Sequence, residues 1–60
     1  MLFNINQYVQ VVNHSEPQCN GQYGSITDIQ TAYDGTYYYT VALEETYGIC
    51  VCTDDELMEG

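Results

Sequence analysis

Four side chains in this sequence have atoms that bind transition metals, and they are His14, Cys19, Cys50 and Cys52. Structural zinc sites usually pair two cysteines roughly two to four residues apart with a second matched pair. Cys50 and Cys52 would point both thiols to the same side of a strand, which is compatible with chelation. His14 and Cys19 would come from a loop. Because buried free thiols are the commoner use of such cysteines, we predict no metal and no cofactor.

The sequence lacks the residue groups on which most catalytic sites depend. A nucleophilic mechanism needs a Cys or Ser beside a His, an orienting group and donors for an oxyanion. Phosphoryl chemistry is unsupported because there is no Lys or Arg and no phosphate-binding glycine loop. Hydrolysis by paired carboxylates needs a cleft that a chain of 60 residues can hardly form. We therefore predict that the protein is not an enzyme.

The carboxylates are the most abundant reactive groups, and they are concentrated toward the C-terminus. Six of the nine fall among the last seventeen residues: Glu44, Glu45, Asp54, Asp55, Glu56 and Glu59. If the elements that hold them lie together, they form a concentrated negative surface that fits a basic groove. The alternative is a solvated acidic face that protects a sheet edge. We predict partner contacts at five of them, namely Glu44, Glu45, Asp54, Asp55 and Glu56.

The charge balance narrows the class of partner. The formal net charge is −9, and the chain has no Lys or Arg. Direct binding to nucleic acid depends on cationic side chains that release counterions from phosphates, so it is excluded as a function. An anionic membrane surface repels such a chain for the same reason. We predict a protein partner with a basic surface, which suits a nucleic-acid-binding protein.

Seven tyrosines provide a second signal of binding, and three of them, Tyr37, Tyr38 and Tyr39, are consecutive. In a strand they cannot all point inward. We predict that Tyr37 and Tyr39 pack in the core and that Tyr38 lies on the opposite face. Tyrosine is enriched at interfaces, which makes Tyr38 a candidate contact residue, although β-propensity alone also favours it in a strand.

The sequence predicts one domain over residues 1–60 and places it in the cytoplasm. The first residues have no basic start and no long apolar run, so we expect neither a signal peptide nor a membrane span. Three cysteines are an odd number, and they fit a reducing compartment better than a disulfide framework.

Apolar residues recur mostly with period two, which indicates an all-β fold. We predict strands over residues 8–12, 23–33, 36–45 and 49–52, with a long polar loop over 13–21. The spacing of Ile26 and Ile29 predicts a bulge between them, and Asp34-Gly35 predicts a hairpin turn. In the fourth strand we predict that Ile49 and Val51 face the core. Capping-box spacing over residues 53–56 predicts a short helical turn, after which residues 57 and 58 would fold back and close a barrel.

The aliphatic and glycine pattern resembles SH3-like barrels of the KOW type. The matching residues are Val9-x-Val11, Gly21-x-x-Gly24-x-Ile26-x-x-Ile29, Tyr39-x-Val41-x-Leu43 and the ending Asp55-Glu56-Leu57. The resemblance spans roughly residues 8–59. It implies a small five-stranded barrel with a short helical turn before the last strand, and glycines that permit a tight turn into the second strand.

Related barrels occur in the variable subunit of ferredoxin–thioredoxin reductase, in nitrile hydratase β-subunits and in small proteins of bacteria and phages. KOW domains bind RNA or polymerase, but this chain lacks their basic residues. The expected function is a phage-type acidic inhibitor that mimics nucleic acid and blocks a CRISPR effector, a restriction enzyme or RNA polymerase. The alternatives are an accessory SH3-like subunit that docks into a larger assembly and a small zinc-binding domain.

Overall fold

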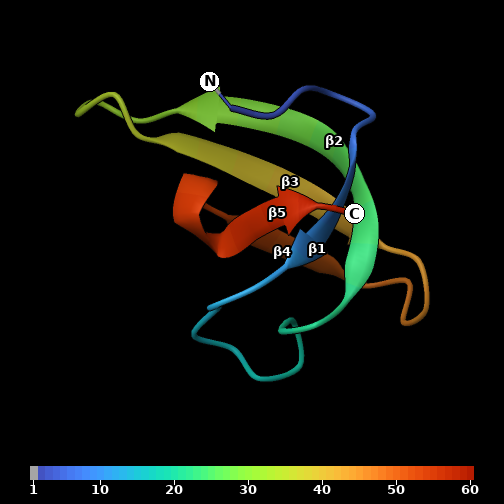
Figure 1. The fold of residues 1–60 in the computed structure, drawn as a ribbon. Helices are drawn as coiled ribbons and strands as arrows, with labels where there is room; N and C mark the ends of the chain where they lie inside the picture. Colours follow the sequence, from blue (N-terminus) through green and yellow to red (C-terminus); the bar gives the residue numbers. More distant parts are fainter. Residues whose placement is uncertain (1) are drawn as a thin grey trace.

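The computed structural model describes residues 2–60 and consists almost entirely of β-structure. Its strands are β1 (Tyr8–Val11), β2 (Tyr23–Thr31), β3 (Tyr37–Leu43), β4 (Ile49–Cys52) and β5 (Leu57–Glu59), and a 3₁₀ turn, η1 (Asp54–Glu56), precedes β5. The strands form one antiparallel sheet in the order β4-β3-β2-β1-β5 (Figure 1). The all-β prediction is confirmed, with β4 and β5 as the two edges of the sheet.

Period-two alternation correctly places the core residues of β1 and β3. Val9 and Val11 are both fully buried, and so are Tyr39 and Val41 in β3. Phe3, from the segment before β1, packs edge-on against the ring of Tyr39 with ring centroids 5.5 Å apart. This contact brings the N-terminal segment onto the same core that the strands enclose.

The predicted orientation of β4 is wrong. Ile49 and Val51 are exposed, whereas Cys50 and Cys52 are buried. The register explains this, because Cys50 pairs with the inward residue Val41 and directly paired residues share a face of the sheet. A strand with apolar or thiol side chains on both faces has no polar face to reveal its orientation.

β2 has the irregularity that the sequence predicts. Its register with β3 shifts between Ile26 and Asp28, so Thr27 is the extra residue of a bulge. A bulge bends the strand and increases its twist. β2 ends at Thr31, two residues earlier than predicted, since the hairpin turn already closes with the Ala32 amide donating to the carbonyl of Thr36 at 2.8 Å.

The two glycines before and within β2 have different functions. Gly21 lies in a turn with φ +81°, a conformation that suits glycine, as predicted. Gly24 is in the strand itself, where a Cβ atom would overlap the carbonyl oxygen of Ala42 on β3. It therefore permits close approach of two strands rather than a turn.

The capping prediction over residues 53–56 is confirmed. The Thr53 amide donates to the Glu56 carboxylate at 2.9 Å, and the Glu56 amide donates to the Thr53 carbonyl at 3.0 Å. The chain then enters β5, in which Leu57 is buried and pairs with Val11 of β1. η1 thus directs the last strand back to the first.

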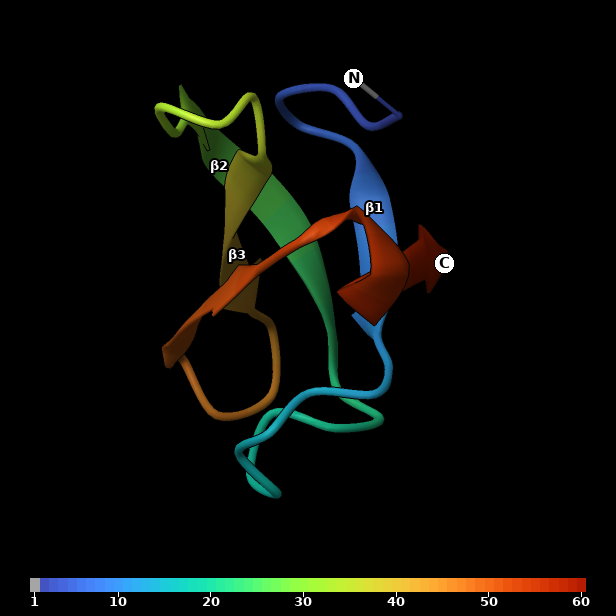
Figure 2. The ribbon, with the colours of Figure 1, turned by 90° about the vertical axis from the view of Figure 1, so that its left-hand side faces the viewer.

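A disulfide joins the β1–β2 loop to the edge strand β4. Cys19 and Cys50 are bonded across a sequence separation of 31, with their Cα atoms 6.3 Å apart, and Cys52 is a buried free thiol. The free-thiol interpretation of Cys19 and Cys50 is therefore wrong. Sequence spacing could not show the pairing, because it depends on the loop turning back toward β4, as Figure 2 shows from the side of the sheet.

No helix in residues 2–60 is long and apolar enough to cross a membrane.

Candidate functional site

The predicted contact residues lie in two separate groups. Glu44 and Glu45 form the turn cluster, in the turn between β3 and β4, and Asp54, Asp55 and Glu56 form the η1 cluster. The two clusters are at opposite ends of β3 (Figure 1), since the turn follows its last residue and η1 contacts its Tyr39 end. At about 3.3 Å per residue, the part of β3 from Tyr39 to Leu43 spans roughly 13 Å. The structure does not join them into one patch.

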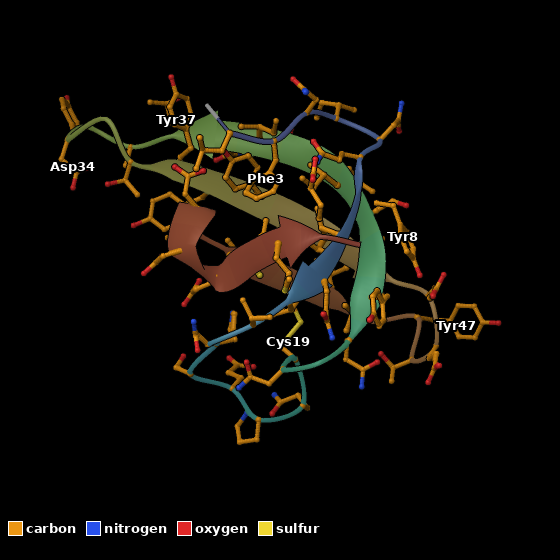
Figure 3. The ribbon with its side chains drawn as sticks, in the orientation of Figure 1. Phe3, Tyr8, Cys19, Asp34, Tyr37 and Tyr47 are labelled. Carbon is orange, nitrogen blue, oxygen red and sulfur yellow. A yellow bond between two sulfur atoms is a disulfide. The ribbon has the colours of Figure 1, made fainter. Side chains whose placement is uncertain are left out.

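The turn cluster is linked to a pair of exposed tyrosines. The Tyr8 hydroxyl donates to Glu44 Oε1 at 2.6 Å, and the Tyr8 ring stacks on Tyr23 with centroids 5.7 Å apart. The hydrogen bond to Glu44 is the largest cause that raises the pKa of Tyr8 to about 12. Figure 3 shows Tyr8 and Tyr47 at this end of the molecule. Glu45 is exposed and, within residues 2–60, makes no side-chain hydrogen bond.

The η1 cluster is bound into the fold. Asp54 accepts a hydrogen bond from the hydroxyl of buried Tyr39 at 2.6 Å. Burial, followed by this hydrogen bond, raises the pKa of Tyr39 above its usual value. Asp55 accepts from the Thr53 hydroxyl, while Glu56 accepts from the Thr53 amide. All three carboxylates therefore have a structural role in addition to any contact with a partner.

Tyr38 lies where the sequence places it. It is exposed on the face of β3 opposite to buried Tyr39, while Tyr37 is half-buried against the core. Thr40 and Ala42 follow it along the same face of β3. This part of the sheet is available for contact with another molecule.

Two exposed apolar residues of β4 were not expected from the sequence, because β4 was assigned the wrong orientation. Ile49 is 69% exposed and Val51 is 53% exposed, and they pair with Ala42 and Thr40. Together with Tyr38 these residues form the outer β3–β4 face. The face is largely apolar, and each of the two acidic clusters lies at one end of it.

Two further tyrosines, Tyr33 and Tyr47, are more than nine-tenths exposed in the β2–β3 and β3–β4 turns. The sequence does not show whether Tyr47 is a core residue or an exposed contact residue. Its backbone has φ +57°, and its ring points away from the sheet (Figure 3). It adds an exposed aromatic residue next to the turn cluster.

The four candidate metal ligands do not form one site, because Cys19 and Cys50 are bonded to each other. His14 and Cys52 do lie near one another, and Glu56 joins them, with one ligand atom of each residue within 4.8 Å of the others. Glu56 could not be recognised as a candidate ligand from the sequence, since its proximity to His14 and Cys52 depends on η1.

No pocket is present in the part of the chain that the structure describes, so the candidate contact residues are those of the open surface. No protein-family model, no curated protein and no solved structure matches this chain.

Proposed function

We propose that this chain is a non-catalytic binding protein that covers a basic surface of a nucleic-acid-handling protein. The observation that supports the proposal is the unbalanced charge: nine carboxylates, no Lys or Arg, and a net charge of −9. A surface with only negative side chains attracts a cationic groove as phosphates do, and this attraction accelerates association. The partner classes are a CRISPR effector, a restriction enzyme and an RNA polymerase, and the proposed source is a phage that uses the chain as an inhibitor.

The distribution of charge supports a contact made of three parts. The turn cluster and the η1 cluster flank the outer β3–β4 face, so acidic groups lie at both ends of an apolar centre. Interfaces commonly have such an apolar centre and a polar rim, and tyrosine is frequent in the centre. In this arrangement Tyr38 is the anchor and the two clusters determine orientation and salt dependence.

We also propose that the five-stranded sheet curls into an SH3-like barrel. Supporting features are the bulge in β2, the long first loop, the tight later turns and the 3₁₀ turn before β5. The β1–β2 loop adds to this, since the His14 side chain hydrogen-bonds to the Val51 carbonyl on edge strand β4 at 2.9 Å. The loop thereby connects the β1 side of the sheet to the opposite edge.

The cytoplasm remains the proposed location, and the disulfide provides a direct test of it. Disulfides persist in oxidising compartments and are rare in the cytosol, where glutathione keeps thiols reduced. Alkylation of thiols in intact cells, followed by mass spectrometry, should find Cys19 and Cys50 modified if the cytoplasmic proposal is correct. Recovery of both residues unmodified and bonded would place the protein in an oxidising compartment.

The experiment for the function is displacement of fluorescent duplex DNA from purified members of the three partner classes at low and moderate salt. We expect this chain to displace DNA from at least one of them, with affinity falling as salt increases. The informative variant is Glu45→Gln/Asp55→Asn, which removes one charge from each cluster without removing the contacts of Tyr39 or of the Thr53 amide. It should bind several-fold more weakly.

The matched control is Glu16→Gln/Glu59→Gln, which removes the same number of charges from the β1–β2 loop and from β5. It should bind almost as well as the parent chain. An equal loss of affinity in both variants would show that binding responds to net charge alone. Failure of the parent chain to displace DNA from any member of the panel would refute the proposed function.

The exposed apolar residues favour a second candidate, an accessory subunit that docks into a larger assembly. Ile49 and Val51 together with Tyr38 supply an uncharged contact face. Binding of this kind should hardly change between low and moderate salt, and it should be lost in Val51→Asp while the Glu45→Gln/Asp55→Asn variant binds normally.

A further inference from the structure

Three parts of the chain bring different metal-binding atoms to one place beside the acidic η1 cluster. His14 comes from the β1–β2 loop, Cys52 ends β4, and Glu56 ends η1. One ligand atom of each lies within 4.8 Å of the other two. Cys52 is buried, whereas His14 and Glu56 are half-buried, so the three residues lie where the core meets the surface.

We propose that His14, Cys52 and Glu56 form a binding site for a divalent metal ion, and that the ion is Zn²⁺. Imidazole nitrogen, thiolate sulfur and carboxylate oxygen are the three donor types that zinc uses in proteins. The hard oxygen-seeking cations do not favour a thiolate, and softer cuprous ions favour sites richer in sulfur. Three protein ligands leave a fourth coordination position for water. This site goes beyond the proposed binding function and does not depend on it.

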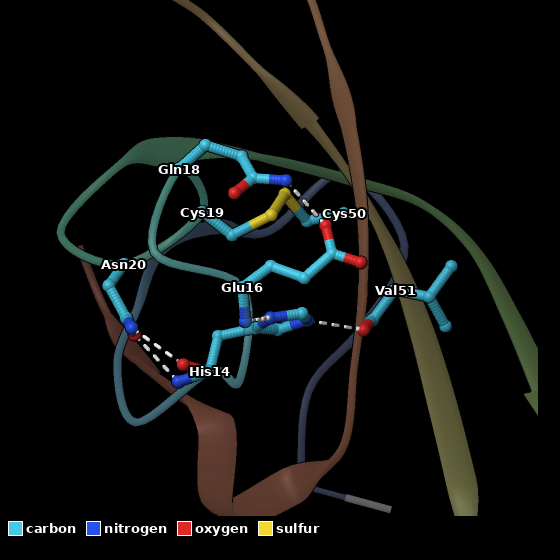
Figure 4. Close-up of a disulfide and its surroundings, with 7 residues drawn as sticks. All are labelled: His14, Glu16, Gln18, Cys19, Asn20, Cys50 and Val51. Atoms are coloured by element: carbon cyan, nitrogen blue, oxygen red, sulfur yellow. Dashed lines mark hydrogen bonds between the residues drawn. A yellow bond between two sulfur atoms is a disulfide. The ribbon is translucent and has the colours of Figure 1, made fainter.

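The loop already holds the His14 ring in position. Its Nε2 atom is 2.9 Å from the Val51 carbonyl oxygen, and its Nδ1 atom accepts a hydrogen bond from the Glu16 amide at 3.0 Å (Figure 4). Because Nδ1 is an acceptor, the neutral ring has its proton on Nε2. Metal binding at Nδ1 replaces the contact with the Glu16 amide, and the Nε2–H group continues to donate to the Val51 carbonyl and to orient the ring.

The loop that holds His14 is itself fixed in two ways. The Asn20 side chain donates to the His14 carbonyl and accepts from the His14 amide, both at 2.6 Å. The Cys19–Cys50 disulfide then fastens the loop to β4, next to Cys52. Pre-positioning of this kind lowers the entropic cost of bringing ligands together.

Charge also favours a cation at this site. Glu56 supplies one negative charge to the site directly, and Asp54 and Asp55 of the same 3₁₀ turn add two more nearby. When a divalent ion binds, the S–H proton passes to solvent and a metal–sulfur bond forms, with no change in oxidation state. The site then gains positive charge in a chain that has no Lys or Arg to balance its carboxylates.

The test is titration of the disulfide-bonded protein with Co²⁺, a spectroscopic substitute for Zn²⁺, without thiol reductant. We expect one equivalent to bind, a thiolate-to-cobalt charge-transfer band to appear, and Zn²⁺ to abolish that band. Cys52→Ala should lose the band. Because this variant also removes a core side chain, its fold is checked by far-ultraviolet circular dichroism.

Glu56→Gln is the second variant, and it keeps an oxygen that can accept from the Thr53 amide. It should retain the band and weaken Co²⁺ binding by about tenfold or more. The control is Glu16→Gln, which changes a carboxylate in the same loop outside the ligand set and should bind Co²⁺ as the parent does. Absence of stoichiometric binding, or equal affinity in the parent and in both ligand variants, would refute the site.

Discussion

Two tyrosine–carboxylate hydrogen bonds of equal length lie at opposite ends of this molecule. At the η1 end, the Tyr39 hydroxyl donates to Asp54 at 2.6 Å, and at the turn end the Tyr8 hydroxyl donates to Glu44 at 2.6 Å. Tyr39 is fully buried, while Tyr8 is 42% exposed. The chemistry of the two pairs is the same, and their surroundings differ.

The difference indicates that the η1 end stabilises the fold, whereas the turn end is available to a binding partner. Tyr39 is buried and Asp54 is half-buried, so leaving their hydrogen bond unmade is costly because little water can replace it. An exposed pair exchanges its partner for water at little cost. We infer that the carboxylates of the η1 end hold η1 on the core, whereas those of the turn end are free to rearrange when a partner binds.

The largest expected effect comes from removing the disulfide, which fastens the loop beside the η1 end. Cross-linking residues 31 apart restricts the unfolded chain, and a loop of this length corresponds to about 3–4 kcal/mol of stability. For a domain of this size, each kcal/mol shifts the melting temperature by about 4–8 °C. Cys19→Ser/Cys50→Ser should therefore melt well over 10 °C lower than the parent, measured by circular dichroism.

Addition of a dithiol reductant to the parent should give the same shift, and the double variant should not respond to it. If the reduced parent and the variant both melt where the oxidised parent does, the disulfide contributes nothing and the η1 end is stable through its hydrogen bonds alone.

The second effect compares the two hydroxyls directly. Tyr39→Phe removes the donor to Asp54 and leaves the ring against Phe3 unchanged. We expect a loss of about 1 kcal/mol in the free energy of unfolding, measured by urea denaturation. If Tyr39→Phe lowers the free energy of unfolding by less than Tyr8→Phe does, the comparison is contradicted.

The sequence predicted this division only in part. Alternation identified Tyr39 as a core residue, and the spacing of Thr53 and Glu56 identified η1 correctly. The sequence also contained a signal that was not used: in a hairpin, the residues after the second strand return to the start of the first. The β3–β4 hairpin therefore requires the turn cluster and the η1 cluster to lie at opposite ends.

Other features were not accessible from sequence. The orientation of β4 depends on its register with β3, and the alternation of Ile49-Cys50-Val51-Cys52 is equally apolar on both sides. The disulfide and the approach of His14 to Cys52 depend on the path of the β1–β2 loop. Long-range contacts of this kind leave no local pattern in the residues that make them.

Alkaline pH offers a third test of the same comparison. Burial and the hydrogen bond to Asp54 raise the pKa of Tyr39 above the ordinary tyrosine value of 10.0 that applies in the unfolded chain. The folded state therefore favours the neutral hydroxyl, and this contribution is complete below pH 10 and declines as the pH rises through the folded-state pKa. Urea midpoints above pH 10 should fall more steeply for the parent than for Tyr39→Phe. If the urea midpoints of the parent and of Tyr39→Phe fall in parallel above pH 10, the pKa of Tyr39 is the same in the folded and the unfolded chain.

The smallest effect is expected at the exposed pair. The pKa of Tyr8 is about 12, raised first by its hydrogen bond to Glu44, so an ultraviolet titration of the parent should include a late tyrosine that Tyr8→Phe removes. The unfolding midpoint of this variant at neutral pH should nevertheless match that of the parent, because water replaces the lost hydroxyl at Glu44. A raised pKa and an unchanged stability are compatible here, since water competes for the exposed Tyr8 hydroxyl and Glu44 carboxylate in the folded state. Destabilisation equal to that of Tyr39→Phe would show that the turn end is as structural as the η1 end, and it would remove the reason for treating Glu44 as free to meet a partner.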